Sequence, residues 1–378
     1  MMTRISALLL ALIFGSAVFA ETCNVIVKRY GELPDGEAVQ IYRLKNANGM
    51  IAEITNYGGI ITRLTAPDRK GRQDDVVLGY SRLEDYLAAT PYFGAIVGLY
   101  GNRIADGKFE LEGESYQLTN NSEAGGVPVH LHGGTKGLDK VLWSGRPSVG
   151  KEAANLILNY VHPDGAEGYP GNVRIRVVYR LTNENELEVS YRATTEKVTI
   201  INLTHHSYFN LHGEGKGTPL DHLLMINAHH FTPITSNMVP TGELMPVKGT
   251  PFDFTSPVAP RDRIDEDHLQ LKLGGGFDHN WVLRREGEGL ELAATVYEPV
   301  SGRYMEVLTE EPGIQYYSGN FLDGSLVGKS GASYEYRSGF CLETQHYPDS
   351  PNHANFPSTT LKPGEIYKTR TVYRFSVR

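Results

Sequence analysis

The stretch that decides the fold is residues 173–191, which read VRIRVVYRLTNENELEVSY. From Val173 to Tyr179 apolar residues alternate with mostly basic ones, the period-2 pattern of a strand with one buried and one wet face. The segment Asn183–Asn185 is a turn signal, and the alternation resumes after it from Leu187 to Tyr191. The stretch therefore predicts two antiparallel strands joined by a tight turn.

The same pattern recurs along the chain. Residues 367–377, YKTRTVYRFSV, alternate in the same way, and turn signals such as Pro67–Gly71 and Tyr169–Gly171 separate other short runs. Helical periodicity appears only in short pieces such as Ser81–Ala89. The chain holds 41 Gly, 20 Pro, 22 Tyr and 13 Phe, a mixture that favours many short strands. We expect an all-β fold: a large antiparallel β-sandwich with few short helices.

Composition and charge exclude several functional classes. The chain has 378 residues, 40% hydrophobic and 21% charged, so it can bury a large core and is not a disordered protein. A formal net charge of −8 excludes a strongly basic nucleic-acid-binding surface. Two cysteines cannot form a disulfide-rich scaffold or a four-cysteine zinc site.

The N-terminus has the three regions of a signal peptide. Arg4 supplies the positive start, Ile5–Phe14 the apolar core, and the small residues Val18 and Ala20 a cleavage site before Glu21. The apolar run is shorter than the ~20 residues that span a bilayer. We expect residues 1–20 to be removed and residues 21–378 to form one exported domain, without a membrane segment, in the periplasm or secreted.

Export makes a disulfide between the two cysteines, Cys23 and Cys341, worth considering. A bridge requires their Cα atoms within ~7 Å of each other, which a sequence does not show. Two free thiols are the favoured interpretation, and the bridge stays open as the alternative.

Acid–base residues gather in a few runs. In the run Asn202–Leu211, strand alternation puts His206, Tyr208 and Asn210 on one face. Burying such a face is costly unless each polar group has a partner, so we expect it to form a pocket wall. A glutamate, Glu343, lies inside the apolar run Phe340–Gln345, where strand propensity and burial both disfavour it. By composition alone, a structural ion pair explains Glu343 as well as a catalytic role does.

Two other patterns have ordinary explanations. Histidines at 130 and 132, 205 and 206, and 229 and 230 suggest zinc, but the chain has no His-Glu-x-x-His or paired-cysteine spacing, and we expect no metal. Gly274–Gly276 resembles a phosphate loop, but Trp281–Leu283 reads as a strand and no helix follows, so a hairpin turn is expected there.

Taken together, ordered runs over nearly the whole chain after residue 20 resemble the aldose 1-epimerase (galactose mutarotase) family. The early motifs are Thr55–Gly58, Pro67–Gly71, Asp75–Gly79, Tyr92–Gly98 and Asn102–Ile104. The later ones are Leu131–Gly134, Glu167–Gly171, His206–Leu211, Gly276–Asn280, Pro312–Gln315 and Leu342–Gln345. The resemblance implies a mutarotase-like β-supersandwich and a cofactor-free interconversion of the α and β anomers of galactose or glucose.

The family motifs also imply site roles. Glu343 resembles the general base, His206 the general acid, and His132 the second active-site histidine. The positions that resemble hydroxyl-binding residues are Asn102, Arg103, Asp278 and Gln315, and Tyr208 is added as a substrate-binding residue of the His206 strand. The chain departs from the family at Leu99 (usually Arg), Gly101 (usually Ala) and His205 (usually Asn), so sugar preference or local packing can differ.

The implied partner is a free monosaccharide, with the chain acting as a monomer or a homodimer. The main alternative is a non-catalytic sugar-binding protein on the same fold. A glycoside hydrolase is a third interpretation, since it needs two carboxylates about 5–9.5 Å apart and the pair Asp278 and Glu343 supplies two. A sugar-phosphate epimerase is less favoured, because no concentrated Arg/Lys set is present.

Overall fold

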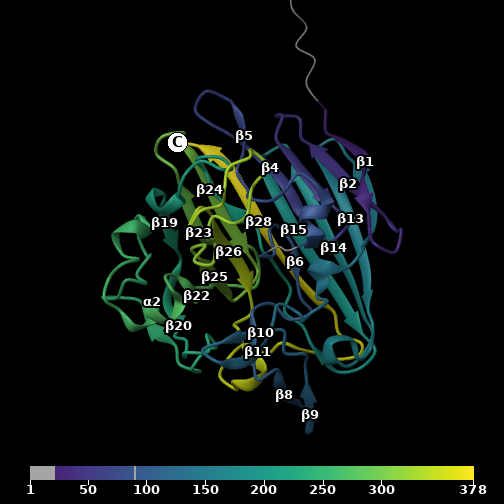
Figure 1. Ribbon diagram of the computed structural model, residues 1–378, viewed down its shortest axis with the longest axis vertical. Coiled ribbons are helices and arrows are strands. Elements are labelled where there is room, and N and C mark those ends of the chain that lie inside the picture. The colour runs from purple at the N-terminus through teal and green to yellow at the C-terminus, as the bar shows by residue number, and fades with distance from the viewer. Residues whose placement is uncertain (1–21, 89–90) are drawn as a thin grey trace, which may run out of the picture.

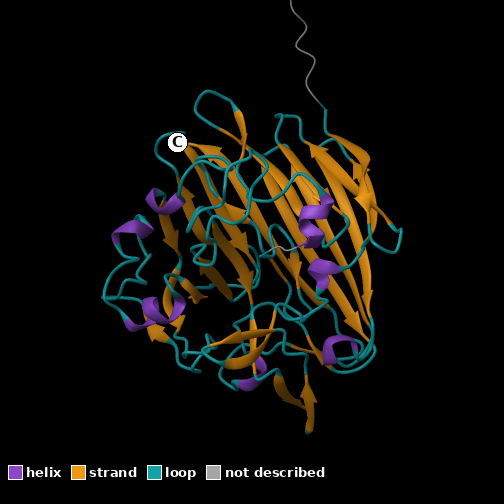
Figure 2. Cartoon of the chain, in the orientation of Figure 1, coloured by secondary structure: helices purple, strands orange, loops and turns teal. Residues whose placement is uncertain are grey.

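The strands form three larger antiparallel sheets and several small ones (Figures 1 and 2). The computed structural model describes residues 22–88 and 91–378, so the expected signal peptide, residues 1–20, lies outside them. Within the described residues the all-β expectation is confirmed: the helices are α1 (Leu83–Ala88), α2 (Leu269–Gly274) and the short 3₁₀ turns η1 (Leu138–Lys140), η2 (Ala166–Gly168), η3 (Pro219–Asp221), η4 (Pro260–Asp262) and η5 (Ser350–Asn352). None of these helices is long and apolar enough to cross a membrane.

The largest sheet has eight strands. In spatial order they are β12 (Ser144–Val149), β13 (Ala153–His162), β14 (Val173–Thr182), β15 (Glu186–Thr195), β28 (Tyr367–Val377), β24 (Arg303–Thr309), β23 (Glu291–Tyr297) and β19 (Leu223–Ile226). The six-stranded sheet orders β18 (Tyr208–Phe209), β26 (Phe340–Gln345), β25 (Gly313–Tyr317), β22 (Asp278–Leu283), β20 (Ala228–Thr232) and β21 (Met245–Pro246).

The remaining strands lie in smaller groups. A five-stranded sheet contains β1 (Asn24–Glu32), β2 (Ala38–Lys45), β3 (Ile51–Thr55), β4 (Ile61–Pro67) and β5 (Gln73–Asp75). The three-stranded group is β10 (Ser122–Ala124), β11 (Val127–Leu131) and β7 (Arg103–Ala105). The pairs are β6 (Ile96–Val97) with β17 (Thr204–His205), β8 (Lys108–Leu111) with β9 (Glu114–Gln117), and β16 (Thr199–Ile200) with β27 (Thr360–Leu361).

The predicted hairpin forms two interior strands of the eight-stranded sheet. Strands β14 and β15 pair antiparallel around the turn at Asn183–Asn185, and β28 pairs with the other edge of β15 (Figure 1). The alternate residues Val173, Ile175, Val177 and Tyr179 are buried, as predicted. Burying an apolar side chain of this kind stabilises the fold by about 1.5–3 kcal/mol. The apolar face of β14 therefore packs on the core, and its basic face is left toward solvent.

The six-stranded sheet has one aromatic face and one polar face. On β22, β25 and β26 the side chains of Trp281, Tyr316 and Phe340 belong to the main hydrophobic core. The alternate residues on the same strands carry carboxylates, amides and a thiol, in two cross-strand rows: Asp278, Tyr317, Cys341 and Tyr208 form the first, and Asn280, Gln315 and Glu343 form the second. Strand alternation thus gathers polar groups from distant parts of the chain on one surface.

Three local predictions differ from the structure in the type or the length of the element. Gly274–Gly276 is not a hairpin turn: Gly274 ends α2, and Gly275, with φ +66, caps it through the carbonyls of Leu271 and Lys272. This is the left-handed glycine cap that commonly ends a helix. The helix expected at Ser81–Ala89 is observed as α1, and Ala89 lies outside the described residues.

The run Asn202–Leu211 is also not one continuous strand. It contains two short strands, because β17 pairs with β6 while β18 pairs with β26. The strand pairing therefore changes between His205 and Tyr208, and β18 ends before Asn210. The two cysteines, Cys23 and Cys341, are both buried and free, which confirms the interpretation as two thiols.

Candidate active site

A cavity of about 450 Å³ opens beside the polar face of the six-stranded sheet. It lies within the ~300–1,000 Å³ range of small-molecule pockets. Seven of the eight residues proposed from the sequence line it: Asn102, Arg103, His132, His206, Tyr208, Asp278 and Glu343. They come from β7 and the residue before it, from the residue after β11, from the link between β17 and β18, and from β18, β22 and β26. Segments from across the chain therefore converge on one cavity.

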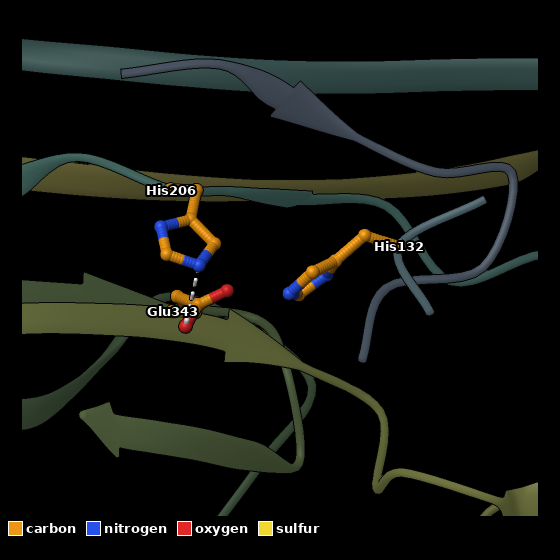
Figure 3. Close-up of side chains that lie close together, drawn as sticks. All are labelled: His132, His206 and Glu343. Atoms are coloured by element: carbon orange, nitrogen blue, oxygen red, sulfur yellow. Dashed lines mark ion pairs between the residues drawn. The ribbon is translucent and has the colours of Figure 1, made fainter. Parts of the chain in front are cut away.

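Glu343 and His206 face each other across this cavity. The two side chains approach from opposite sides, with His132 beside them (Figure 3). The distance between Nε2 of His206 and Oε1 of Glu343 is 3.7 Å, and Oε2 of Glu343 is buried without a hydrogen-bond partner. Among the described residues the ion-pair partner of Glu343 is His206, which is charged only when protonated, and no lysine or arginine gives the carboxylate a permanent counter-ion. An unpartnered buried carboxylate oxygen is costly and indicates a group that meets a ligand.

Burial shifts the two groups in opposite directions. It raises the pKa of the Glu343 carboxyl well above its usual value, with nearby Asp278 adding to the shift and Arg103 opposing it. Burial also lowers the pKa of His206 to about 4. A carboxylate with a raised pKa is a stronger base, and an imidazolium with a lowered pKa is a stronger acid. The shifts thus suit proton transfer in both directions.

His132 is held as one tautomer. Its Nδ1 accepts the backbone N–H of Asn102 at 3.1 Å, and its own backbone N–H donates to the Asn102 carbonyl at 3.0 Å. The proton of the neutral ring is therefore on Nε2, and burial holds the pKa of His132 well below 6.5. Gly133 permits the turn that follows, since a Cβ there would lie 1.8 Å from the Gly98 carbonyl oxygen. The neutral ring can donate one hydrogen bond from Nε2.

The remaining polar groups surround these three. Asp278 accepts a hydrogen bond from Nε2 of Gln315 at 2.7 Å, and burial raises the pKa of Asp278. Nε of Arg103 is buried without a partner. Gln315 is not among the residues that line the cavity; it holds Asp278 from behind. Its expected direct contact with a sugar hydroxyl stays a prediction.

One group of possible ligands coincides with the site. Single ligand atoms of His132, His206 and Glu343 lie within 4.8 Å of one another. A metal ion needs a free lone pair from each ligand, but Nδ1 of His132 already accepts the Asn102 N–H and Nε2 carries the ring proton. The donor set therefore fits a proton-transfer site better than a metal centre.

The structure adds cavity residues that the sequence did not single out, among them Tyr92 and Tyr317, and it puts the buried Cys341 directly behind His206. The Tyr92 ring lies 4.6 Å from the His132 ring and 5.7 Å from the His206 ring, between centroids. Sγ of Cys341 lies 3.4 Å from Nδ1 of His206. Strand alternation from Glu343 and Gln315 gives Cys341 and Tyr317, whereas Tyr92 lies in a loop with φ +65 and has no periodic signal.

One predicted wall residue lies elsewhere. Asn210 is fully buried and donates to the carbonyls of Gly217 and Ser338, so it joins loops and is no part of the cavity wall. Its prediction failed because β18 ends at Phe209, so strand alternation does not extend to Asn210, whereas Tyr208 lines the cavity as predicted. The three departures from the family pattern, Leu99, Gly101 and His205, are buried or packed outside the cavity lining.

Comparisons with known proteins agree with this geometry. The family model described as aldose 1-epimerase matches residues 40–374. The galactose mutarotase of Sus scrofa is 46% identical over 349 residues, covering 92% of this chain and 97% of the relative, and the aldose 1-epimerase of Escherichia coli (strain K12) is 35% identical over 346 residues, covering 90% and 96%. A crystal structure of galactose 1-epimerase from Lactobacillus acidophilus NCFM has a TM-score of 0.81 and 28% identity, covering 94% of this chain and 99% of that one.

Proposed function

The chain belongs to the aldose 1-epimerase family and is a mutarotase, and from this premise we propose that Glu343 and His206 open and reclose the ring of a free aldohexose, galactose or glucose. One observation carries the assignment. A buried carboxylate with a free oxygen faces an imidazole nitrogen at 3.7 Å, inside a cavity of sugar size.

The proposed reaction is a pair of proton transfers that reverses itself. Glu343 takes the proton of the C1 hydroxyl while Nε2 of His206 gives a proton to the ring oxygen. The C1–O5 bond breaks, its electron pair goes to O5, and C1 becomes an aldehyde. Rotation about C1–C2 presents the other carbonyl face, and the reverse transfers close the ring as the other anomer. The oxidation state of C1 is unchanged overall, so the reaction requires no redox cofactor.

The other cavity residues have roles that follow from their donors. His132 carries its proton on Nε2 and donates to the sugar, and Arg103 offsets negative charge that develops on oxygen in the transition state. Asn102, Asp278 and Tyr208 provide partners for the remaining hydroxyls, with Gln315 orienting Asp278. All of these residues lie in one chain, which supports action as a monomer or as a homodimer of independent sites.

Anomer exchange in the wild-type protein tests the proposal. NMR exchange spectra on glucose, galactose, xylose and arabinose in parallel are expected to show catalysed α–β interconversion, with galactose or glucose among the fastest. Saturable sugar binding without faster exchange would instead indicate a binding protein. Release of free sugar from an aryl glycoside would indicate a hydrolase.

We further propose that the protein is exported and acts in the periplasm or outside the cell. The ordered charged, apolar and small-residue regions of residues 1–20 support this. The intact mass of protein recovered from the periplasm or the medium is expected to correspond to a chain starting near Glu21. Retention of full-length protein in the cytosol would contradict the prediction.

A further inference from the structure

A buried thiol lies directly behind the general acid. Cys341 is fully buried on β26, two residues before Glu343, and its Sγ lies 3.4 Å from Nδ1 of His206. On the other side of the ring, Nε2 faces Glu343. Within the described residues, the thiol is the side-chain hydrogen-bond partner of Nδ1. The contact between Cys341 and His206 has no role in the proton transfers proposed for Glu343 and His206.

We propose that Cys341 is a positioning residue for the general acid: its sulfur accepts the Nδ1–H of His206, so that the exchanging proton resides on Nε2, where Glu343 and the sugar meet. The inference rests on the proposed function, since it assigns His206 as the group that protonates the ring oxygen. Cys341 itself touches neither the sugar nor the transferred proton.

Nδ1 of His206 needs an acceptor because it carries a proton throughout the reaction cycle. As the imidazolium gives its Nε2 proton to the ring oxygen, the neutral ring that remains carries its proton on Nδ1. Nδ1 is therefore a donor in both states, and a buried donor without an acceptor is destabilising. If the neutral ring instead rested with its proton on Nε2, it could not take back the sugar's proton in the reverse step. An acceptor at Nδ1 thus favours the tautomer that the cycle uses.

The other side chains around His206 do not supply that acceptor; the backbone carbonyl of His206 itself also interacts with the ring and favours its charged form. The rings of Tyr92, His132, Tyr208 and Tyr317 pack against the imidazole as aromatic contacts, with centroids 5.1–6.4 Å away. Glu343 is the charged group that faces the ring, and it lies on the Nε2 side. Ser207, the next residue, has its hydroxyl 3.2 Å from Nδ1 of His205.

A neutral sulfur suits this position better than a charged oxygen. Thiols are weak acceptors, whereas a carboxylate behind the ring would stabilise the imidazolium strongly. Burial also raises the pKa of the Cys341 thiol well above its usual value, so the group stays uncharged. The thiol therefore orients the ring and fixes its tautomer while leaving the imidazolium a strong acid.

The test replaces the acceptor and keeps the volume. Cys341→Val removes the acceptor, Cys341→Ser retains one, and Cys23→Ser changes the other buried thiol, which contacts Asn183 outside the cavity. For Cys341→Val we expect kcat to fall by about tenfold or more with KM within about twofold, since the loss concerns proton transfer. The serine variant is expected to recover most of the rate, and Cys23→Ser is expected to match wild type.

The pH profile supplies a readout that a packing defect would not move. Because the pKa of His206 is lowered to about 4 and that of Glu343 is raised, the acidic limb of kcat reports titration of His206, and without an acceptor at Nδ1 the charged ring is less stable. In Cys341→Val this limb is therefore expected to shift to lower pH, and in Cys341→Ser it is expected to return. An unchanged profile and rate in the valine variant would overturn the inference.

The tautomer of His206 can also be determined by NMR, without an activity assay. ¹⁵N NMR of the His206 ring, assigned by its disappearance in His206→Asn, is expected to show the Nδ1–H form in wild type and a shift toward Nε2–H in Cys341→Val. An Nε2–H ring in wild type would overturn the inference even if the valine variant failed to fold. Absence of anomer exchange in wild type, in contrast, would refute the proposed function while leaving the tautomer measurement decisive for Cys341.

Discussion

Glu343→Gln is expected to lower kcat for mutarotation by about 10²–10⁴-fold, the usual contribution of a well-placed acid–base group. The amide has nearly the same shape as the carboxylate but cannot take the C1 hydroxyl proton. Polarimetry on freshly dissolved α-galactose measures the rate. A variant that retains near wild-type kcat would remove Glu343 from the role of base.

The same substitution is expected to stabilise the fold at neutral and alkaline pH. The pKa of Glu343 is raised in the folded state, so its contribution to stability is fully present below the unfolded pKa, about 4.3, and is lost as pH rises through the folded value. Glutamine carries no charge and avoids this loss. We therefore expect a higher Tm for Glu343→Gln at pH 8 and a smaller difference near pH 4.5.

A second buried glutamate provides the matched control. Glu311 is 2% exposed, lies outside the cavity and forms an ion pair of 2.7 Å with His346, raising the pKa of that histidine. Glu311→Gln removes the counter-ion and is expected to lower Tm at pH 6, with little effect on kcat. Stabilisation by both substitutions, or by neither, would show that burial of the charge at Glu343 is not what limits stability.

His206→Asn is expected to reduce kcat by about 10²–10⁴-fold as well, because no group remains to protonate the ring oxygen. The neighbouring substitution His205→Asn is the control: His205 is equally buried, but it does not line the cavity, and the family pattern has asparagine there. Stopped-flow polarimetry of both variants, with circular dichroism for folding, makes the comparison. Equal losses in the two variants would indicate a general packing effect and would contradict the role of His206.

The regular parts of the fold were predictable because their signal is local. Alternation from Val173 to Tyr191 specifies two strands and their turn without reference to any other segment, and residues 367–377 specify a third in the same way. Gly274–Gly276 was misjudged because a glycine cap depends on the preceding helix, whose six residues give little periodic signal. Short elements lack the repeats on which such predictions depend.

The site was predictable as a set of residues but not as a geometry. Family motifs gave Glu343, His206 and His132, and the structure brings them together in one cavity. Cross-strand register decides the rest: it puts Gln315 behind Asp278 and puts Cys341 against His206. Tyr92 reaches the two histidines only through tertiary packing, so no pattern near it in the chain could reveal its position.

The most direct test of the central claim is a crystal structure of Glu343→Gln with galactose. We predict that the C1 hydroxyl lies within hydrogen-bond distance of the residue 343 side chain, and that the ring oxygen lies within hydrogen-bond distance of Nε2 of His206. A sugar bound with C1 turned toward the cavity mouth, away from both side chains, would contradict the account.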